Sequence, residues 1–354
     1  MADEDITVII KDLQPERNYR LHLSLNHRNG THESSAIFRS DKTGTIDLTN
    51  SAPISGSYSV VEPMGLFMSM VPAEGYRYGS PIVAVPTSKP FLYTLRVLDA
   101  SGNAISSIEI ERYFEHPALE RIEIENEKLT GTIYKPKHSN GALPVVIDLY
   151  GSSGGIKEHR ASLLASHGFV VLCLPYFAYK NLPQRLMDVD LDYFQNAIEY
   201  ICSLPYTTDH CGIIGTSLGA AIACLLAIRN EKVKGIITIN GPPVLDSFIE
   251  FHENGKLMPI AITEDYGEMR LKNGIPMYKS LQETLPYDSS LVFPIEQSLK
   301  DTKFYFIASI DDDSNCSVSA ARVLCNRLRK SGHWFDMDVV WGGHLIDPPY
   351  MPHV

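Results

Sequence analysis

The 354-residue chain has no apolar run that approaches the roughly 18–20 residues of a membrane-spanning helix. Its first residues, MADEDITV, are acidic and lack the basic, then apolar pattern of a secretory signal and the Arg-rich pattern of a transit peptide. Its last residues, Pro352, His353 and Val354, do not match Ser-Lys-Leu, the peroxisomal address. The sequence therefore predicts a cytoplasmic protein without a membrane span.

Cysteine is scarce and is confined to the second half of the chain. The six cysteines are Cys173, Cys202, Cys211, Cys224, Cys316 and Cys325. None of them forms a Cys-x-x-Cys pair, and most lie in apolar segments. A zinc site is typically built on such pairs, and a reducing compartment keeps thiols unpaired. We therefore expect reduced, buried thiols and no metal site.

Positive charge is also in short supply. The chain has 31 Lys and Arg residues against 42 Asp and Glu residues, which gives a net charge of -11 at pH 7. Nucleic-acid binding requires a basic face, so this composition argues against it. A smaller polyanion would need a local basic patch, but the basic residues near candidate loops are interpreted as ordinary solvated charges: Lys157, His159, Arg160, Lys180 and Arg185.

The first third of the chain alternates between polar and apolar residues. Between about residues 6 and 112, short runs with a period of two are separated by turn residues, as in 6–10, 19–25, 56–61, 91–97 and 105–110. This period is typical of antiparallel strands. About 100 residues of such strands are most simply a β-sandwich, and no convincing helix is expected among them. We place a first domain at residues 1–115.

The pattern changes after a connector that begins near residue 111. Apolar strands then alternate with helical segments, which predicts a parallel sheet covered on both faces. We expect a hairpin at 121–134, strands at 143–150, 169–174, 212–215, 233–240, 303–309 and 336–341, and helices at 158–167, 191–204, from 217 onward and at 317–331. The second domain is placed at residues 116–354. Residues 248–298 have no clear period and are interpreted as an insertion near the site.

One pentapeptide in this domain indicates a nucleophile. Gly215-Thr-Ser-Leu-Gly219 fits Gly-x-Ser-x-Gly, in which the serine occupies a strained turn between a strand and a helix. The glycines on either side allow the strand and the helix to pass closely. An apolar strand precedes Gly215 and an Ala-rich helix follows at once, so the context favours Ser217 as a nucleophile over an ordinary turn serine.

A serine nucleophile needs a base, and the base needs an orienting carboxylate. In this architecture the order along the chain is Ser, then Asp or Glu, then His. The strand at 303–309 is followed by three aspartates at 311–313, and the last strand is followed by Gly342-Gly-His344. His344 is the predicted base. The three aspartates are equal candidates on spacing alone, and a solvated turn explains those that have no role.

A developing oxyanion needs two backbone N–H donors. One would come from Leu218, the residue after the nucleophile, and the other from the loop after the strand that ends at Tyr150. That loop reads Gly151-Ser-Ser-Gly-Gly155, and Gly151 and Ser152 are the candidate donors. The loop lacks both the Lys-Ser/Thr ending of a P-loop and the Gly-x-Gly-x-x-Gly pattern, so the oxyanion interpretation is favoured over phosphate binding.

With these residues, the sequence resembles the acyl-CoA thioesterase / bile acid-CoA:amino acid N-acyltransferase family. The resemblance covers nearly the whole chain. Besides the serine pentapeptide, it rests on GTIDLTN (44–50), GSYSVVEPMGL (56–66), VVIDLYGSSGG (145–155), RASLLASHGF (160–169), LPYF (174–177), ING (239–241), DD (311–312) and GHLIDPPYMP (343–352). These segments are long and specific.

The resemblance implies an immunoglobulin-like β-sandwich followed by an α/β-hydrolase domain. It also implies an enzyme of lipid metabolism that cleaves a fatty or bile acyl-CoA thioester without a cofactor, with Ser217 as nucleophile and His344 as base. The family's acid is the second residue of an Asp-Asp pair, which falls on Asp312. Amino-acid-conjugating members carry cysteine at the nucleophile position, so Ser217 favours hydrolysis. Members continue beyond the position of Val354 with a further helix, so the C-terminal segment here is short, and a peroxisomal location occurs in the family.

Several alternatives stay open at this point. An amino-acid N-acyltransferase would use the same triad, a non-catalytic binding protein would keep the same fold, and a general carboxylesterase or lipase would keep the same chemistry. The preferred acyl chain length, the residues that bind CoA and the oligomeric state are not determined by the sequence.

Overall fold

The computed structural model describes residues 1–76, 82, 86–245, 251–261, 270–272, 275–277, 279, 290–346 and 349–351. The chain divides into two compact units between His116 and Pro117, one residue beyond the boundary expected from the sequence. The second unit ends at Leu345. The described residues from Ile346 onward group with the first unit instead.

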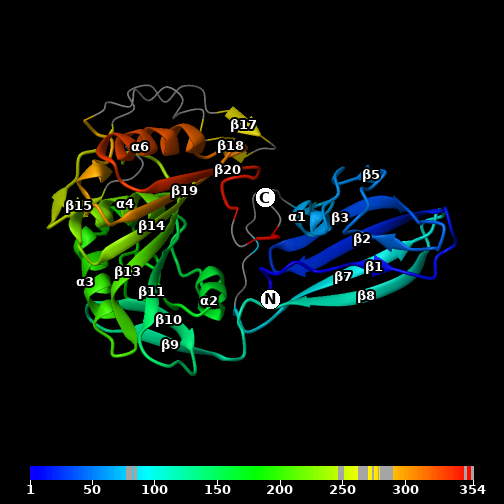
Figure 1. The fold of residues 1–354 in the computed structure, drawn as a ribbon, viewed down its shortest axis with the longest axis horizontal. Helices are drawn as coiled ribbons and strands as arrows, with labels where there is room; N and C mark the ends of the chain where they lie inside the picture. Colours follow the sequence, from blue (N-terminus) through cyan, green and yellow to red (C-terminus); the bar gives the residue numbers. More distant parts are fainter. Residues whose placement is uncertain are drawn as a thin grey trace. The chain divides into compact units, whose positions relative to one another are not determined.

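An antiparallel sheet dominates the first unit (Figure 1). Its order is β5–β3–β2–β7–β8, and β6 also pairs with β3. The strands of this sheet are β2 (Asn18–His27), β3 (Gly30–Arg39), β5 (Ser55–Gly56), β6 (Val71–Pro72), β7 (Phe91–Leu98) and β8 (Ala104–Arg112). The shorter elements are β1 (Ile9–Ile10), β4 (Ile46–Asp47), which pairs with β1, and the helix α1 (Gly65–Met68).

The alternating pattern explains which of these strands the sequence predicts. In β2, Leu21, Leu23 and Leu25 all point into the core, so the period of two is plain in the sequence. The strand β3 is missed because its buried positions include polar residues and glycine, which give no apolar alternation. The strand predicted at 56–61 is wrong beyond Gly56, where β5 ends, and the single turn of α1 was not expected.

An eight-stranded sheet forms the centre of the second unit, in the order β20–β19–β14–β13–β11–β12–β10–β9. From β20 to β12 all neighbours are parallel, and β10 and β9 are antiparallel at one edge. The strands are β9 (Leu119–Glu125), β10 (Thr130–Pro136), β11 (Leu143–Leu149), β12 (Val170–Cys173), β13 (Thr207–Thr216), β14 (Val233–Ile239), β19 (Lys303–Ser309) and β20 (Phe335–Val340). The predicted parallel sheet and the hairpin before it are confirmed.

Helices cover both faces of this sheet (Figure 1). The helix α2 (His159–Ser166) packs on one face, where Ala161 and Ala165 meet Val171. On the other face lie α3 (Leu191–Cys202), α4 (Leu218–Arg229) and α6 (Ser317–Ser331), which share a core with the strands. All residues of α4 from Leu218 to Ala227 are buried, which is why its sequence is apolar throughout. The predicted α/β-hydrolase domain is confirmed, and the unit before it is rich in β-strands, as expected for the predicted immunoglobulin-like β-sandwich.

Much of the insertion expected at 248–298 lies outside the described residues. Its described parts include two small antiparallel hairpins and a short 3-10 helix. These elements are β15 (His252–Glu253), β16 (Lys256–Leu257), β17 (Arg270–Lys272), β18 (Ile275–Met277) and the 3-10 helix at Ile295–Gln297, and a second 3-10 helix lies at Leu186–Asp188.

Candidate active site

Ser217 forms the whole connection between β13, which ends at Thr216, and α4, which begins at Leu218. Its backbone has φ 56° and ψ −121°, a conformation that residues with a Cβ rarely adopt. The N–H of Ser217 donates to the carbonyl of Ile239 at 2.8 Å, which ties the turn to the neighbouring strand β14. The local structure is the strained turn that the pentapeptide predicts.

Two glycines make this turn sterically accessible. A Cβ on Gly215 would lie 2.2 Å from the carbonyl oxygen of Gly219, and a Cβ on Gly219 would lie 2.5 Å from the carbonyl oxygen of Leu149. Real Cβ atoms do not approach other atoms so closely, so a side chain at Gly215 would push α4 from β13, and one at Gly219 would push α4 from the end of β11. The glycines of Gly-x-Ser-x-Gly therefore serve close approach of the backbone.

Asp312 and His344 lie close together at the carboxyl end of the parallel sheet. Asp312 lies in the loop after β19, and His344 follows β20, so parallel neighbours deliver both from their carboxyl ends. His344 Nδ1 lies 2.9 Å from Oδ2 and 3.0 Å from Oδ1 of Asp312. The Asp312 side chain is fully buried, whereas that of His344 retains 20% of its exposure. Of the three aspartates at 311–313, Asp312 is the one bonded to His344.

The hydrogen-bond partners of Asp312, His344 among them, keep its carboxylate ionised. Burial raises the pKa of Asp312, but the charge of His344 and the hydrogen bonds to the carboxylate together lower it below its ordinary value. The Ser317 hydroxyl and the N–H of Asn315 donate to the same carboxylate and act in the same direction. A carboxylate held in this way fixes the orientation of the imidazole ring.

Ser217 and His344 follow strands of one parallel sheet, yet no hydrogen bond joins them within the described residues. Their loops are nevertheless linked through β14, because Ser217 N donates to Ile239 O and the next residue, Asn240, donates to the carbonyl of His344 at 2.9 Å. Bonds between nucleophile and base are often long in unliganded hydrolases and tighten when substrate binds.

The glycine loop after β11 lies directly against Ser217. A Cβ on Gly151 would be 3.1 Å from Ser217 Cβ and 3.5 Å from its Oγ. Leu218 opens α4, so its N–H belongs to the first turn, where helices leave their donors without intrahelical partners. The structure thus brings Gly151 and Leu218 to the nucleophile, and Ser152 follows in the exposed part of the loop.

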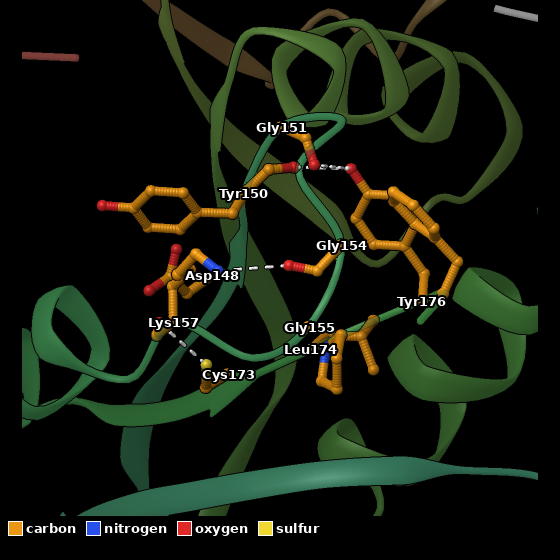
Figure 2. Close-up of a pocket in the computed structure, with 11 residues that line it drawn as sticks. Asp148, Tyr150, Gly151, Gly154, Gly155, Lys157, Cys173, Leu174 and Tyr176 are labelled. Atoms are coloured by element: carbon orange, nitrogen blue, oxygen red, sulfur yellow. Dashed lines mark hydrogen bonds between the residues drawn. The ribbon is translucent and has the colours of Figure 1, made fainter. Parts of the chain in front are cut away.

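Figure 2 shows what holds the base of this loop. The Tyr176 hydroxyl lies 2.7 Å from the carbonyl of Tyr150 and 2.8 Å from that of Gly151, and donates to them. Lys157 Nζ donates to the carbonyl of Gly154 at 3.2 Å. The cavity that these residues line has a volume of about 10 Å³, enough for one water molecule and no more. These contacts hold the loop in shape.

A buried arginine lies behind the same loop. Arg160 donates to the Asp148 carboxylate, through Nε at 2.9 Å and through Nη2, and also to Thr216 Oγ1 at 2.6 Å. Its guanidinium carbon lies 4.6 Å from the ring centroid of Tyr150. The interpretation of Arg160 as a solvated charge is wrong, and so is that of its neighbour His159, which is 4% exposed and bonded to the Tyr150 hydroxyl. The signal that predicts a buried partner is Asp148 itself, a charged residue inside an otherwise apolar strand.

Three further features concern possible metal ligands, the cysteines and the helices. In the described part of the chain, no group of three or more His, Cys, Asp and Glu side chains is arranged to hold a metal ion. All six cysteines are free thiols, and all except Cys316 are buried. Among the described helices, none combines the length and apolar character needed to cross a membrane.

Comparison with known proteins identifies the family. Residues 3–126 match the model described as "Acyl-CoA thioester hydrolase/BAAT N-terminal region", and residues 189–354 match "BAAT / Acyl-CoA thioester hydrolase C terminal". The chain is 30% identical to the bile acid-CoA:amino acid N-acyltransferase of Mus musculus, over 99% of this chain and 86% of the relative. It is 31% identical to acyl-coenzyme A thioesterase 6 of Mus musculus, over 99% of this chain and 84% of the relative.

Among solved structures, the acylaminoacyl peptidase of Pyrococcus horikoshii aligns with 73% of this chain and 44% of its own, at 15% identity and a TM-score of 0.48. The family assignment rests on the sequence, since both family regions match and the identity extends over nearly the whole chain. The chain belongs to the acyl-CoA thioester hydrolase/BAAT family.

Proposed function

We propose that the protein is an acyl-CoA thioesterase, which hydrolyses fatty acyl-CoA to a free fatty acid and CoA through Ser217, His344 and Asp312. The observation on which the proposal depends is the strained turn that places Ser217 at the carboxyl end of the sheet, where Asp312 is bonded to His344. Membership of a family that contains named acyl-CoA thioesterases supports the choice of substrate.

The geometry supports a two-step acyl transfer. His344 takes the proton of the Ser217 hydroxyl as Ser217 Oγ attacks the thioester carbonyl carbon, and the N–H groups of Leu218 and Gly151 receive the developing oxyanion. The C–S bond then breaks, and His344 returns the proton so that CoA leaves as a thiol. Water activated by His344 attacks the acyl-enzyme, which releases the fatty acid and regenerates Ser217. Asp312 stabilises the imidazolium in both steps.

Serine at position 217 favours water over an amine as the second acceptor, because an oxygen ester with water at hand is hydrolysed. The relatives include both kinds of enzyme by name, a bile acid-CoA:amino acid N-acyltransferase and several acyl-coenzyme A thioesterases. The product therefore has to be identified, in addition to the release of the thiol.

The test is a thiol-release assay over acyl-CoAs of increasing chain length, with and without glycine or taurine, and with product identification by mass spectrometry. We expect free fatty acid as the main product, and a loss of roughly 10³-fold or more in Ser217→Ala. Ser203→Ala is the control, because Ser203 is an exposed serine at the end of α3 and should keep full activity.

Three other results of these experiments would contradict the proposal, and each would identify a different function. A conjugate that exceeds the free acid would identify an N-acyltransferase, and faster turnover of p-nitrophenyl esters than of acyl-CoA would identify a general esterase. If fluorophosphonate labelling were absent from the folded wild-type protein and from Ser217→Ala alike, the protein would be a binding protein of this fold.

A further inference from the structure

Asn240 lies immediately after β14, between the strands that lead to the nucleophile and to the acid. It is 1% exposed, and its φ of 52° is positive, which is uncommon for a residue other than glycine. It belongs to the Ile-Asn-Gly segment at 239–241, which the proposed mechanism does not use. A buried polar side chain on a strained backbone needs strong compensating contacts to persist.

The side-chain amide of Asn240 makes those contacts with two loops. Its Nδ2 donates to the carbonyls of His344 at 2.9 Å and Gly343 at 3.2 Å, and lies 2.9 Å from Ser309 Oγ. Its Oδ1 accepts the N–H of Ser309 at 2.8 Å. Two carbonyls on one side and an N–H on the other determine the orientation of the amide, since a flipped amide would lose these bonds.

The backbone of Asn240 reaches the loops of the nucleophile and the acid. Its N–H donates to Ile307 O at 3.0 Å, and its carbonyl accepts from Asn315 Nδ2 at 2.7 Å. The N–H of Asn315 in turn donates to the Asp312 carboxylate at 3.0 Å. The residue before Asn240 accepts the N–H of Ser217. One residue is therefore bonded, directly or through one neighbour, to all three loops of the proposed triad.

Two glycines leave the start of the His344 loop without side-chain anchors. Gly342 and Gly343 precede His344 and have no side chains with which to anchor it, and Gly342 has φ 141°. Within the described residues, the hydrogen bonds of Gly343 and His344 to the rest of the protein go to Asn240 and Asp312. Asp312 orients the imidazole ring of His344, and Asn240 holds the His344 backbone in place.

We infer that Asn240 is a positioning residue for the proposed triad, which sets the place of His344 relative to Ser217 by holding the His344 carbonyl beside β14. This inference rests on the proposed function of Ser217 and His344. A base displaced by about 1 Å loses roughly 100-fold in rate, because proton transfer requires hydrogen-bond reach. Asn240 does not touch the reacting atoms, so its effect falls on the rate of the chemical step and leaves substrate binding unchanged.

The informative variant is Asn240→Asp. It keeps the acceptor for Ser309 N–H but turns the amide that faces Gly343 and His344 into an acceptor, which opposes their carbonyls. We expect kcat for thiol release and the rate of fluorophosphonate labelling of Ser217 to fall roughly 100-fold, with KM for acyl-CoA within about threefold of wild type. Asn240→Gly tolerates the positive φ and loses only the amide, so it should show a similar fall.

Asn230→Ala is the matched control. Asn230 accepts the N–H of Lys232 and donates to Gln195 before β14 begins, at the opposite end of the strand from Asn240. It should lower the melting temperature and leave the labelling rate within about twofold of wild type. Circular dichroism on each variant establishes that labelling is measured on folded protein.

The inference is overturned if folded Asn240→Asp and Asn240→Gly label as fast as wild type, or if Asn230→Ala labels as slowly as they do. Wild-type protein that is labelled but does not release CoA would refute the proposed substrate, while the labelling rates would still decide the role of Asn240. Wild-type protein that is not labelled at all would overturn both.

Discussion

Asp312 carries its charge at a point from which water is excluded. Burial alone would raise its pKa, yet the bond to His344, the Ser317 hydroxyl and the N–H of Asn315 together lower it. In the proposed triad, an ionised carboxylate at this position accepts the Nδ1 proton of His344, so that the other ring nitrogen can act on Ser217.

The change Asp312→Asn should keep the fold and remove the charge. An amide does not stabilise the imidazolium and favours the wrong tautomer of His344, so kcat for thiol release should fall by a factor on the order of 10³. Asp311→Asn is the matched control, since Asp311 is exposed in the same loop, and it should keep wild-type activity. Equal activity of the two variants would contradict the role of Asp312.

The lowered pKa of Asp312 also sets a direction for stability against pH. The unfolded chain binds more protons than the native protein in the range between the two pKa values, so this contribution is present above the unfolded value of about 3.9 and is lost as pH falls below it. Urea unfolding of wild type and Asp312→Asn from pH 7 down to pH 3 should show the difference in unfolding free energy shrinking below about pH 4.

At the scale of secondary-structure elements, Arg160 connects one helix and two strands. It stands on α2, donates to Asp148 on β11 and donates to Thr216, the last residue of β13. Asp148 is fully buried and Arg160 nearly so. Removing one partner of such a pair leaves an uncompensated charge in the core, which costs far more than the pair contributes when it is intact.

Arg160→Met should therefore lower the free energy of unfolding by about 3–5 kcal/mol. The control is Arg185→Met, which breaks an exposed pair with Asp188 and should cost at most about 1 kcal/mol. The double variant Arg160→Met with Asp148→Asn should recover part of the loss, because the orphaned charge is gone. Urea unfolding measures all three, and a loss in Arg160→Met no larger than in the control would refute the buried pair.

At the scale of the whole molecule, the first unit contains two separate segments of the chain: residues up to His116 and the described residues from Ile346 onward. Arg112, at the end of β8, is 4% exposed and donates to the carbonyls of Ala2 at 2.6 Å and Glu4 at 2.8 Å. Its guanidinium carbon lies 5.5 Å from the ring centroid of Phe67 and 5.9 Å from that of Tyr350. One buried cation thus connects the first residues, the end of the sheet and residues near the C-terminus.

Arg112→Ala should destabilise the first unit by about 3 kcal/mol, from the lost hydrogen bonds and the space left behind. Arg96→Ala on β7 is the control, since Arg96 is exposed, and it should change stability by less than about 0.5 kcal/mol. Circular dichroism follows the β-sheets, whereas fluorescence follows Trp334 and Trp341, which both lie in the second unit. An unchanged circular-dichroism midpoint in Arg112→Ala would contradict the prediction.

The sequence predicts an element well where burial and residue type agree. Apolar strands such as β11 and the alternating strand β2 were predicted, because their inward positions hold apolar residues. It failed at β3, whose buried positions include His32 and Ser34, and at 56–61, where apolar alternation continues beyond the paired residues. Whether such a segment forms a strand depends on its pairing with neighbouring strands rather than on its local sequence pattern.

The sequence by itself determined the order of the two domains and the candidates Ser217 and His344, because these depend on local period, glycine spacing and the order of strand ends. The family resemblance already indicated Asp312 as the acid, and the tertiary structure shows it bonded to His344. Only the tertiary structure decided that Arg160 is buried beside Asp148. It alone brought Asn240 to the carbonyl of His344, 104 positions further along the chain. The physical reason is that a hydrogen bond forms between neighbours in space, and a parallel sheet makes neighbours of strand ends that are far apart in the sequence.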